Sequence, residues 1–288
     1  MFVSPMLLHK VEEPFDSDDW VSELKLDGIR FLYSTLNGVS FYTRHENEVT
    51  ERFPELITNQ IPKGTILDGE LIITDENGKP DFEALMGRFQ VSKLRRIPIM
   101  SKSNPVTFCA FDVVYFKGKK VSHLPLMERK ALLAEILPED LARITKTLSI
   151  DSSGRALFDL VKQQDLEGIV LKKKDSRYEV GKRSKNWLKV INYKYMTVSI
   201  TGIRKSEFGW LLGFPDGKPA GIMELGVPAD ARKVVYELAK MVGAKETNDY
   251  VYFPNDSLKC KVKYRTLTKA GLLRLPSFLE FASYETDD

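Results

Sequence analysis

Residues 22–31, SELKLDGIRF, decide how the rest of the chain is interpreted. Lys25 stands between two leucines in an alternating apolar pattern, which is typical of a half-buried strand, and the turn-forming pair Asp27-Gly28 follows it. A lysine amine has an ordinary pKa near ~10.4 and is a poor nucleophile at neutral pH. Partial burial beside other cations favours the uncharged amine, which can attack phosphorus or carbon. On their own, these ten residues favour a lysine that reaches out to water before an ordinary turn, so the interpretation depends on the other motifs.

The length and composition predict a folded protein of two domains. A chain of 288 residues exceeds one comfortable hydrophobic core, and 43% hydrophobic with 29% charged residues is ordinary for a globular protein. No stretch approaches the ~18 to 20 unbroken apolar residues of a membrane-spanning helix, and the first twenty residues lack the features of a secretory signal. We therefore expect a cytoplasmic protein, nucleoid-associated if it is bacterial, with no membrane partner.

The cysteines and histidines predict neither a disulfide nor a metal site. Cys109 and Cys260 lie far apart in apolar or alternating contexts, which suits reduced, buried thiols. His9, His45 and His123 are scattered without the spacing of metal ligands. Redox and zinc chemistry are therefore not expected.

The positive charge is segregated along the chain, although the net charge is only +3. Residues 84–111 contain five basic and no acidic residues, residues 172–194 contain nine basic and two acidic, and residues 259–274 contain six basic and no acidic. Such segregation is what a groove for a polyanion needs. Each run by itself is equally typical of a solvated face.

The order of apolar patterns predicts an α+β domain followed by a small barrel. Residues 29–44 read as a hairpin around Asn37-Gly38, a pair that suits a type I′ turn. Helical spacing is found at residues 127–137 and 152–164, the latter with Ser152 as the expected N-cap. After residue 196 come three strand patterns, one helix pattern and two further strand patterns, which predict a five-stranded OB-type barrel.

Six motifs in one order resemble those of the covalent nucleotidyltransferases, in particular ATP-dependent DNA ligases. They are KLDGIR (25–30), TRHEN (43–47), LDGEL (67–71), FCAFDVVYF (108–116), LEGIVLK (166–172) and RSKNWLKV (183–190). The compact bacterial ligase module of non-homologous end joining is the most similar member. The resemblance implies a nucleotidyltransferase (adenylation) domain of antiparallel sheets with helices at residues 1–194 and an OB-fold domain at residues 195–288.

The resemblance implies that Lys25 attacks the α-phosphate of ATP and becomes a lysyl-AMP. AMP then passes to the 5′-phosphate of a nick, and the adjacent 3′-hydroxyl displaces AMP and seals the strand. Each step is an in-line attack on phosphorus, so positioning and charge neutralisation supply most of the acceleration.

The same resemblance assigns the nucleotide contacts. Glu23 would accept a hydrogen bond from the adenine amino group, Phe111 would stack on the purine, and Leu24 would line the pocket. Arg30 and Arg44 would engage the ribose or the nick phosphate, because an arginine fork grips phosphate oxygens in pairs.

The remaining residues implied by the resemblance are acids and lysines. Glu70 would contact the sugar, and Glu167 and Glu70 would hold Mg²⁺ or Mn²⁺, which needs only one or two carboxylates beside water and phosphate. Lys172 and Lys189 would neutralise the α-phosphate and favour the uncharged form of Lys25.

The chain departs from the family pattern in two places. Ile191 stands where many members have a second lysine, a contact that Lys194 could replace. The C-terminal LLRLPSFLEF supplies Arg274 but no Arg-x-Asp-Lys signature. The sequence also begins directly at the catalytic domain. We therefore expect a monomer that seals nicked double-stranded DNA, with a Ku-like end-binding protein or a polymerase domain as the implied partner.

Two other functions remain open at this point. An RNA ligase or a capping-type nucleotidyltransferase also uses Lys-x-Asp-Gly, although Glu23 and the RSKNWLKV stretch argue against capping. A non-catalytic DNA-end-binding module would retain the frame without forming a covalent nucleotide, and would show salt-sensitive DNA binding alone.

Overall fold

The chain forms two compact units, Met1–Asn192 and Tyr193–Asp288. The structure is a computed structural model that describes residues 1–254 and 258–282. The division falls close to the boundary that the sequence predicts after residue 194. Each unit is described below by itself.

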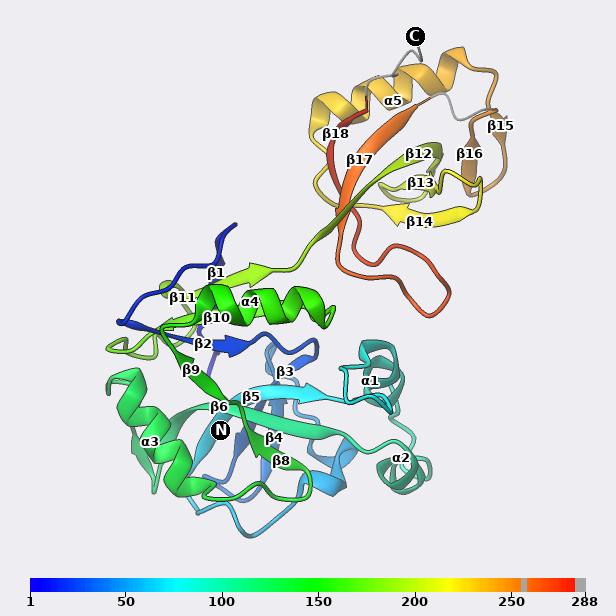
Figure 1. The fold of residues 1–288 in the computed structure, drawn as a ribbon. Helices are drawn as coiled ribbons and strands as arrows, with labels where there is room; N and C mark the ends of the chain where they lie inside the picture. The colour runs from blue at the N-terminus through cyan, green and yellow to red at the C-terminus, as the bar shows by residue number, and fades with distance from the viewer. Residues whose placement is uncertain (255–257, 283–288) are drawn as a thin grey trace. The chain divides into compact units, whose positions relative to one another are not determined.

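The first unit contains a five-stranded sheet with a helix on one face (Figure 1). Its order is β1 (Leu7–Lys10), β11 (Arg183–Ile191), β10 (Gly168–Lys173), β2 (Trp20–Leu24) and β9 (Ser149–Asp151). Helix α4 (Gly154–Gln163) buries Leu157 and Phe158 in one cluster with Ile169 and Leu171 of β10. Because side chains alternate along a strand, Val170 and Lys172 face away from this helix.

A second, six-stranded sheet forms the rest of this unit. Its order is β4 (Ser40–Thr43), β3 (Ile29–Ser34), β5 (Ile66–Ile72), β6 (Thr107–Phe116) and β7 (Lys119–Lys120), with β8 (Ile144–Lys146) paired to β6. Phe31, Phe41, Phe53 and Phe108 pack in its core. Helix α3 (Leu126–Ile136) lies along β6 (Figure 1).

The sheets are mixed, so the predicted all-antiparallel arrangement is wrong in two places. Strand β1 pairs with β11 in parallel, and β8 pairs with β6 in parallel. Hairpin patterns reveal only strands that pair with their neighbours in sequence. Strand β1 instead joins a strand more than 170 positions away, which no local pattern indicates.

The hairpin at residues 29–44 has a longer turn than predicted. Strands β3 and β4 are antiparallel, but Ser34 pairs with Ser40, which leaves a five-residue loop rather than a two-residue type I′ turn. Within this loop only Gly38 has a positive φ, +91°. The physical reason lies in Thr35, whose backbone N–H and hydroxyl bond to the carbonyls of Thr65 and Pro62. These bonds hold residue 35 against the segment before β5, so the pairing of β3 with β4 stops at Ser34, before the predicted turn.

The helices α3 and α4 lie where the sequence predicts them, but the cap of α4 is displaced. Ser152 has φ +53°, and Ser153 occupies the N-cap without a side-chain cap bond. The sequence missed α1 (Phe82–Phe89) and α2 (Ile97–Ser103), together with two 3₁₀ turns, η1 (Thr50–Arg52) and η2 (Pro54–Leu56). Asp81 caps α1 by accepting a hydrogen bond from the N–H of Ala84 at 2.9 Å.

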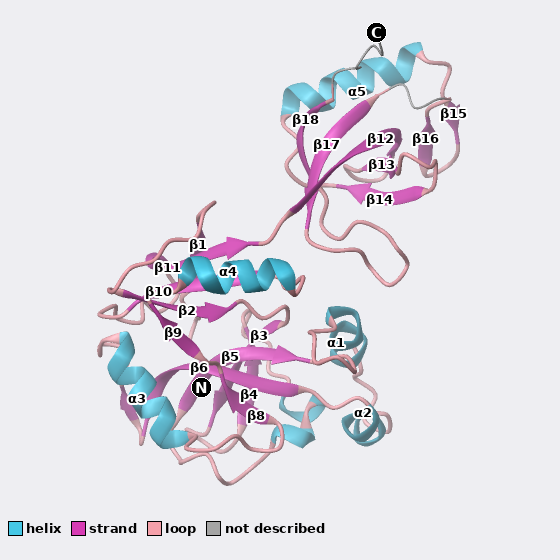
Figure 2. Ribbon diagram, in the orientation of Figure 1, coloured by secondary structure: helices cyan, strands magenta, loops and turns pink. Residues whose placement is uncertain are grey.

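The second unit is a curled sheet with one helix (Figure 2). In chain order its elements are β12 (Lys194–Arg204), β13 (Trp210–Gly213), β14 (Pro219–Met223), α5 (Ala229–Met241), β15 (Lys245–Glu246), β16 (Tyr250–Tyr252), β17 (Lys259–Tyr264) and β18 (Ser277–Phe281). Seven strands replace the five predicted, because β15 and β18 carry no clear pattern. The long β12 bends so that one of its edges pairs with both β16 and β17, around a core that contains Trp210 and Val235 of α5.

Two further properties concern the whole described chain. Cys109 and Cys260 are buried, free thiols. Over residues 1–254 and 258–282, no helix combines the length and the apolar character needed to cross a membrane.

Candidate active site

A pocket lies where the two sheets of the first unit meet. The five-stranded sheet contributes strands β1, β2, β10 and β11, and the six-stranded sheet contributes β3, β5 and β6. Most of the residues that the sequence proposed for nucleotide binding line this pocket. They are Glu23, Leu24, Lys25, Arg30, Glu70, Phe111 and Lys172.

Lys25 lies directly after β2, at the mouth between β2 and β10. Its backbone N–H donates to the carbonyl of Gly168 at 2.9 Å, and its Nζ donates to Glu167 Oε2 at 2.8 Å. The two side chains are 19% and 3% exposed. The structure therefore places the Glu167 carboxylate against Lys25 Nζ, a pairing that the sequence analysis did not name. The neutral state of the amine stays a prediction. The nitrogen must leave this pair, and lose a proton, before it can attack.

Gly28 explains why a tight turn follows the lysine. A Cβ at this position would lie 2.3 Å from the backbone oxygen of Leu71 in β5, far inside contact distance. The chain after Lys25 is thus pressed against the second sheet, and only glycine permits that approach. The turn fixes Lys25 at the junction of the two sheets.

Glu23 is a buried carboxylate held by three hydrogen-bond donors and one further ion pair. Lys172 Nζ reaches Oε2 at 2.7 Å, and Lys130 Nζ forms an ion pair with Oε1. The hydroxyls of Ser149 and Thr147 donate at 2.8 Å and 3.4 Å. Burial alone would raise the pKa of Glu23, but the charges of Lys130 and Lys172 outweigh it and lower the pKa to about 2. Glu23 is therefore an ionised acceptor at any physiological pH.

Two aromatic rings form an apolar wall beside Glu23. Phe111 and Trp187 meet edge to face with centroids 6.1 Å apart, and Lys172 Nζ lies 4.3 Å from each ring centroid. Burial lowers the pKa of Lys172 to about 8, even though Glu23 favours its charged form. The ammonium of Lys172 thus occupies the space between the carboxylate and the rings, and its expected role at the α-phosphate stays a prediction.

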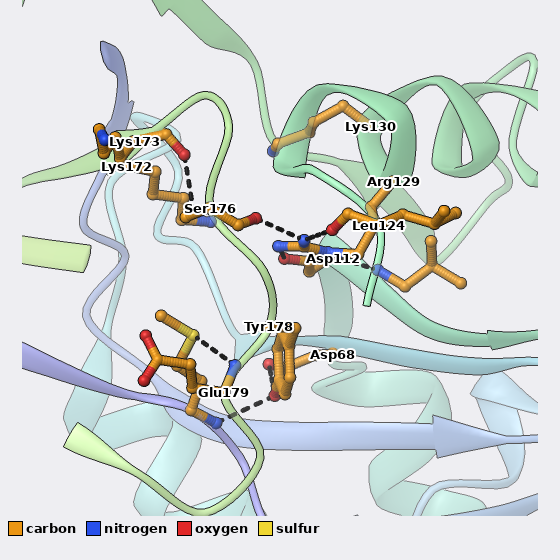
Figure 3. A network of polar contacts seen from close by, with 12 residues as sticks. Asp68, Asp112, Leu124, Arg129, Lys130, Lys172, Lys173, Ser176, Tyr178 and Glu179 are labelled. Atoms are coloured by element: carbon orange, nitrogen blue, oxygen red, sulfur yellow. Dashed lines mark hydrogen bonds and ion pairs between the residues drawn. The ribbon is translucent and has the colours of Figure 1, made fainter. Parts of the chain in front are cut away.

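Arg30 packs against the Phe111 ring and is held there by Asp68. Its guanidinium forms two hydrogen bonds to Asp68, both 2.5 Å long, and lies 4.5 Å from the Phe111 centroid. The Tyr178 hydroxyl donates to the same Asp68 carboxylate (Figure 3). Burial opposes the charge on Arg30, but the pairing with Asp68 prevails and raises its pKa. Asp68 is accordingly a hydrogen-bonding residue that orients Arg30.

Glu167 pairs with the amine of Lys25, and Glu70 interacts with it electrostatically. Burial raises the pKa of Glu70 to about 7, and the negative charges of Glu167 and Asp68 add to this effect against Lys25 and Arg30. Residues 1–254 and 258–282 contain no group of three or more His, Cys, Asp or Glu side chains placed so that they could hold a metal ion by themselves. Two acids fit Mg²⁺ or Mn²⁺, because such an ion takes its remaining ligands from water and phosphate.

The other proposed residues lie outside the pocket lining. Arg44 is exposed after β4, and Lys189 lies on β11 opposite Val170. Ile191 is buried, so the missing lysine of the family is replaced by a core residue. Lys194 and Arg274 belong to the second unit.

Sequence reasoning missed three residues that shape this site: Lys130, Ser149 and Trp187. Trp187 lies within the RSKNWLKV motif, and its alternation with Lys189 could have placed it on the pocket face. Lys130 lies in a stretch with helical spacing, and Ser149 lies in a stretch without a clear pattern. Nothing in the sequence around either residue indicates that its side chain reaches Glu23.

Comparison with known proteins assigns the chain to a family. The family model described as "ATP dependent DNA ligase domain" matches residues 5–190. The chain is 45% identical to the SPbeta prophage-derived DNA ligase-like protein LigB of Bacillus subtilis, over 96% of this chain and 98% of that protein. It is 31% identical to the multifunctional non-homologous end joining protein LigD of Pseudomonas aeruginosa, over 96% of this chain but only 35% of that protein.

Solved structures agree with the fold. A Lig E DNA ligase matches 98% of this chain with a TM-score of 0.71 at 19% identity. The ligase domain of M. tuberculosis LigD matches 97% with a TM-score of 0.60 at 23% identity. The chain spans nearly the whole of LigB and about a third of the P. aeruginosa LigD. With its lysine, carboxylates and aromatic wall gathered in one pocket, this chain belongs to the ATP-dependent DNA ligase family.

Proposed function

We propose that this chain seals nicks in double-stranded DNA through a lysyl-AMP intermediate formed on Lys25. The observation that carries the proposal is the presence of Lys25, Glu23 and Phe111 in one pocket of a DNA ligase family member. Lys25 Nζ forms a bond to the α-phosphorus of ATP as the bond to pyrophosphate breaks. The 5′-phosphate of the nick then takes AMP from the lysine, and the 3′-hydroxyl expels AMP as it forms the phosphodiester.

The proton on Lys25 has a nearby acceptor. Glu167 Oε2 lies 2.8 Å from Nζ, within the range of a general base. The nitrogen is nucleophilic only after this proton has left. Glu167 therefore supports the attack step.

The nucleotide is read by Glu23 and the aromatic wall. Glu23 accepts a hydrogen bond from the 6-amino group of adenine, where guanine has a carbonyl, and Phe111 stacks on the purine. Lys172 makes the two corresponding contacts in the structure, a hydrogen bond to Glu23 and a face contact with Phe111. The carboxylate and the ring thus already bind one amino-bearing group, which supports their proposed contacts with the adenine amino group and ring.

The phosphates are met by cationic side chains and a divalent ion. Arg30, Arg44, Lys172 and Lys189 are proposed to contact ribose or phosphate oxygens. Glu70 and Glu167 would hold Mg²⁺ or Mn²⁺, which when bound neutralises phosphate charge. The raised pKa of Glu70 makes its share of this site dependent on pH.

The second unit is proposed to be an OB-fold domain that contacts the DNA, with the domain boundary at residues 194–195. Several relatives are named for non-homologous end joining, and we propose the same pathway here, with a monomer whose partner on DNA is a Ku-like end-binding protein or a polymerase domain. Exposed Lys93, Arg95, Arg96 and Lys102 supply further positive charge on the first unit.

The test is a sealing assay on nicked DNA with α-labelled ATP and Mg²⁺. We expect label on the protein and a sealed strand, and loss of both in Lys25→Ala but not in Lys173→Ala, which removes an exposed lysine of β10. Labelling by GTP, or sealing of RNA alone, would support the RNA-directed alternatives. Salt-sensitive DNA binding without any label would support the non-catalytic one.

A further inference from the structure

The carboxylate of Glu23 has two chemically different sides. Its Oε2 receives Lys172, which lines the pocket, at 2.7 Å, and a longer hydrogen bond of 3.4 Å from the Thr147 hydroxyl, which does not. Its Oε1 receives Lys130 and the Ser149 hydroxyl, and neither of these lines the pocket. One oxygen is therefore tied to the protein frame, and the other is turned toward the site where a nucleotide would lie.

The position of Lys130 is fixed by its neighbour in α3. Arg129 is fully buried and forms two hydrogen bonds to Asp112 of β6, at 2.8 Å and 2.9 Å. It also donates to the carbonyls of Leu124 and Ser176. Both Arg129 and Lys130 extend from α3 toward the segment that carries Ser176 (Figure 3). The Lys130 side chain is only 12% exposed, so it leaves the helix in a restricted direction.

A bound nucleotide would affect the contacts of Lys172 and Lys130 with Glu23 differently. A purine that enters the pocket must share the space over Phe111 and Trp187 that Lys172 Nζ occupies. Lys130 lies on the other side of the carboxylate and keeps its contact. A buried carboxylate without a paired cation is costly, so Lys130 is the cation that remains to hold Glu23 ionised and in place.

We propose that Lys130 is a positioning residue for nucleotide selection: it holds Glu23 Oε1 against α3 so that Oε2 faces the pocket as the acceptor for a 6-amino purine. The inference rests on the proposed function, because it requires Glu23 to read adenine. Lys130 itself does not touch the nucleotide. Its removal should therefore weaken the recognition of the amino group and leave the attack by Lys25 intact.

The experiment compares self-adenylation with ATP and self-nucleotidylation with purine riboside triphosphate, which lacks the 6-amino group. The measured quantity is the rate constant of nucleotidylation divided by the nucleotide concentration that gives half of the maximal rate. In the wild type we expect this quantity to be about 10- to 100-fold higher for ATP, which corresponds to one hydrogen bond to a charged group. In Lys130→Met the preference should fall to about threefold or less, with a single-turnover rate at saturation within about twofold of the wild type. Lys130→Arg should restore the preference, and Ser149→Ala should lower it less than Lys130→Met.

The matched control is Lys117→Met, which removes an exposed ion pair to Glu135 of the same helix and should keep the full preference. Equal thermal unfolding of the two methionine variants separates positioning from misfolding. A preference in Lys130→Met equal to that of the wild type would overturn the inference, and if Glu23→Gln lost the preference in the same assay the proposed function would stand. A wild type that does not distinguish the two nucleotides would refute the Glu23 contact and the inference together.

Discussion

The buried pair of Arg129 and Asp112 allows the strongest prediction about how the site is supported. Both side chains are 0% exposed, and α3 contacts β6 through this pair. Arg129→Met keeps most of the volume but removes two hydrogen bonds to Asp112 and two to the carbonyls of Leu124 and Ser176. The carboxylate and both carbonyls would then stay buried without these donors.

The expected loss is large because one half of a buried ion pair remains. Removing one partner of such a pair costs about 3–5 kcal/mol, whereas replacing both partners by apolar residues is near neutral. Unfolding midpoints of a unit of this size move by about 2–4 °C per kcal/mol. We therefore expect Arg129→Met to unfold about 6–20 °C below the wild type, and the double variant Arg129→Met/Asp112→Leu to recover most of this loss.

The assay is thermal unfolding followed by tryptophan fluorescence in a Trp210→Phe background. Trp20 and Trp187 then report on the first unit alone, since Trp210 is the remaining tryptophan of the chain. A single variant that unfolds within about 2 °C of the parent, or a double variant less stable than the single one, would refute the reasoning that the uncompensated carboxylate carries the cost.

Three further predictions follow from the site and its surroundings. Because the pKa of Glu70 is about 7, its carboxylate is half ionised at that pH and mostly protonated one pH unit below. Self-adenylation at limiting Mg²⁺ should therefore rise by up to about fivefold from pH 6 to pH 7, and Glu70→Gln should remove this dependence. Gly28→Ala places a methyl group 2.3 Å from a backbone oxygen of β5, so labelling by ATP should fall at least about tenfold without loss of folded structure by circular dichroism. Replacement of the exposed Lys93, Arg95 and Arg96 by glutamine should reduce the slope of log affinity for nicked DNA against log salt by up to about three; an unchanged slope would place DNA elsewhere.

The sequence located the pocket better than it located the contacts inside it. The resemblance of six motifs to a ligase family named Glu23, Lys25 and Lys172 as one site, and all three line the pocket. The pairing partners lie far away in sequence: Lys25 meets Glu167 across 142 positions, and Lys172 meets Glu23 across 149. These ion pairs form only when the strands that carry the two residues come together in the folded sheets, so no local sequence pattern indicates them.

The missed elements have a similar cause. Helices α1 and α2 lie in the basic run at residues 84–111, where charge obscured the helical spacing. Arg88 of that run is fully buried against Glu55, so it serves the core and not a polyanion surface. The parallel strands β1 and β8, and the short β15, carry too few residues for a period to be detected.

The most direct test of the covalent route is the intact mass of the protein before and after incubation with ATP and Mg²⁺, followed by peptide mapping. We expect a gain of one adenylate per chain, located on the peptide that contains Lys25 and absent from Lys25→Ala. An adenylate mapped to another lysine, or an unmodified mass in a folded protein that binds ATP, would contradict the assignment of this amine as the nucleophile.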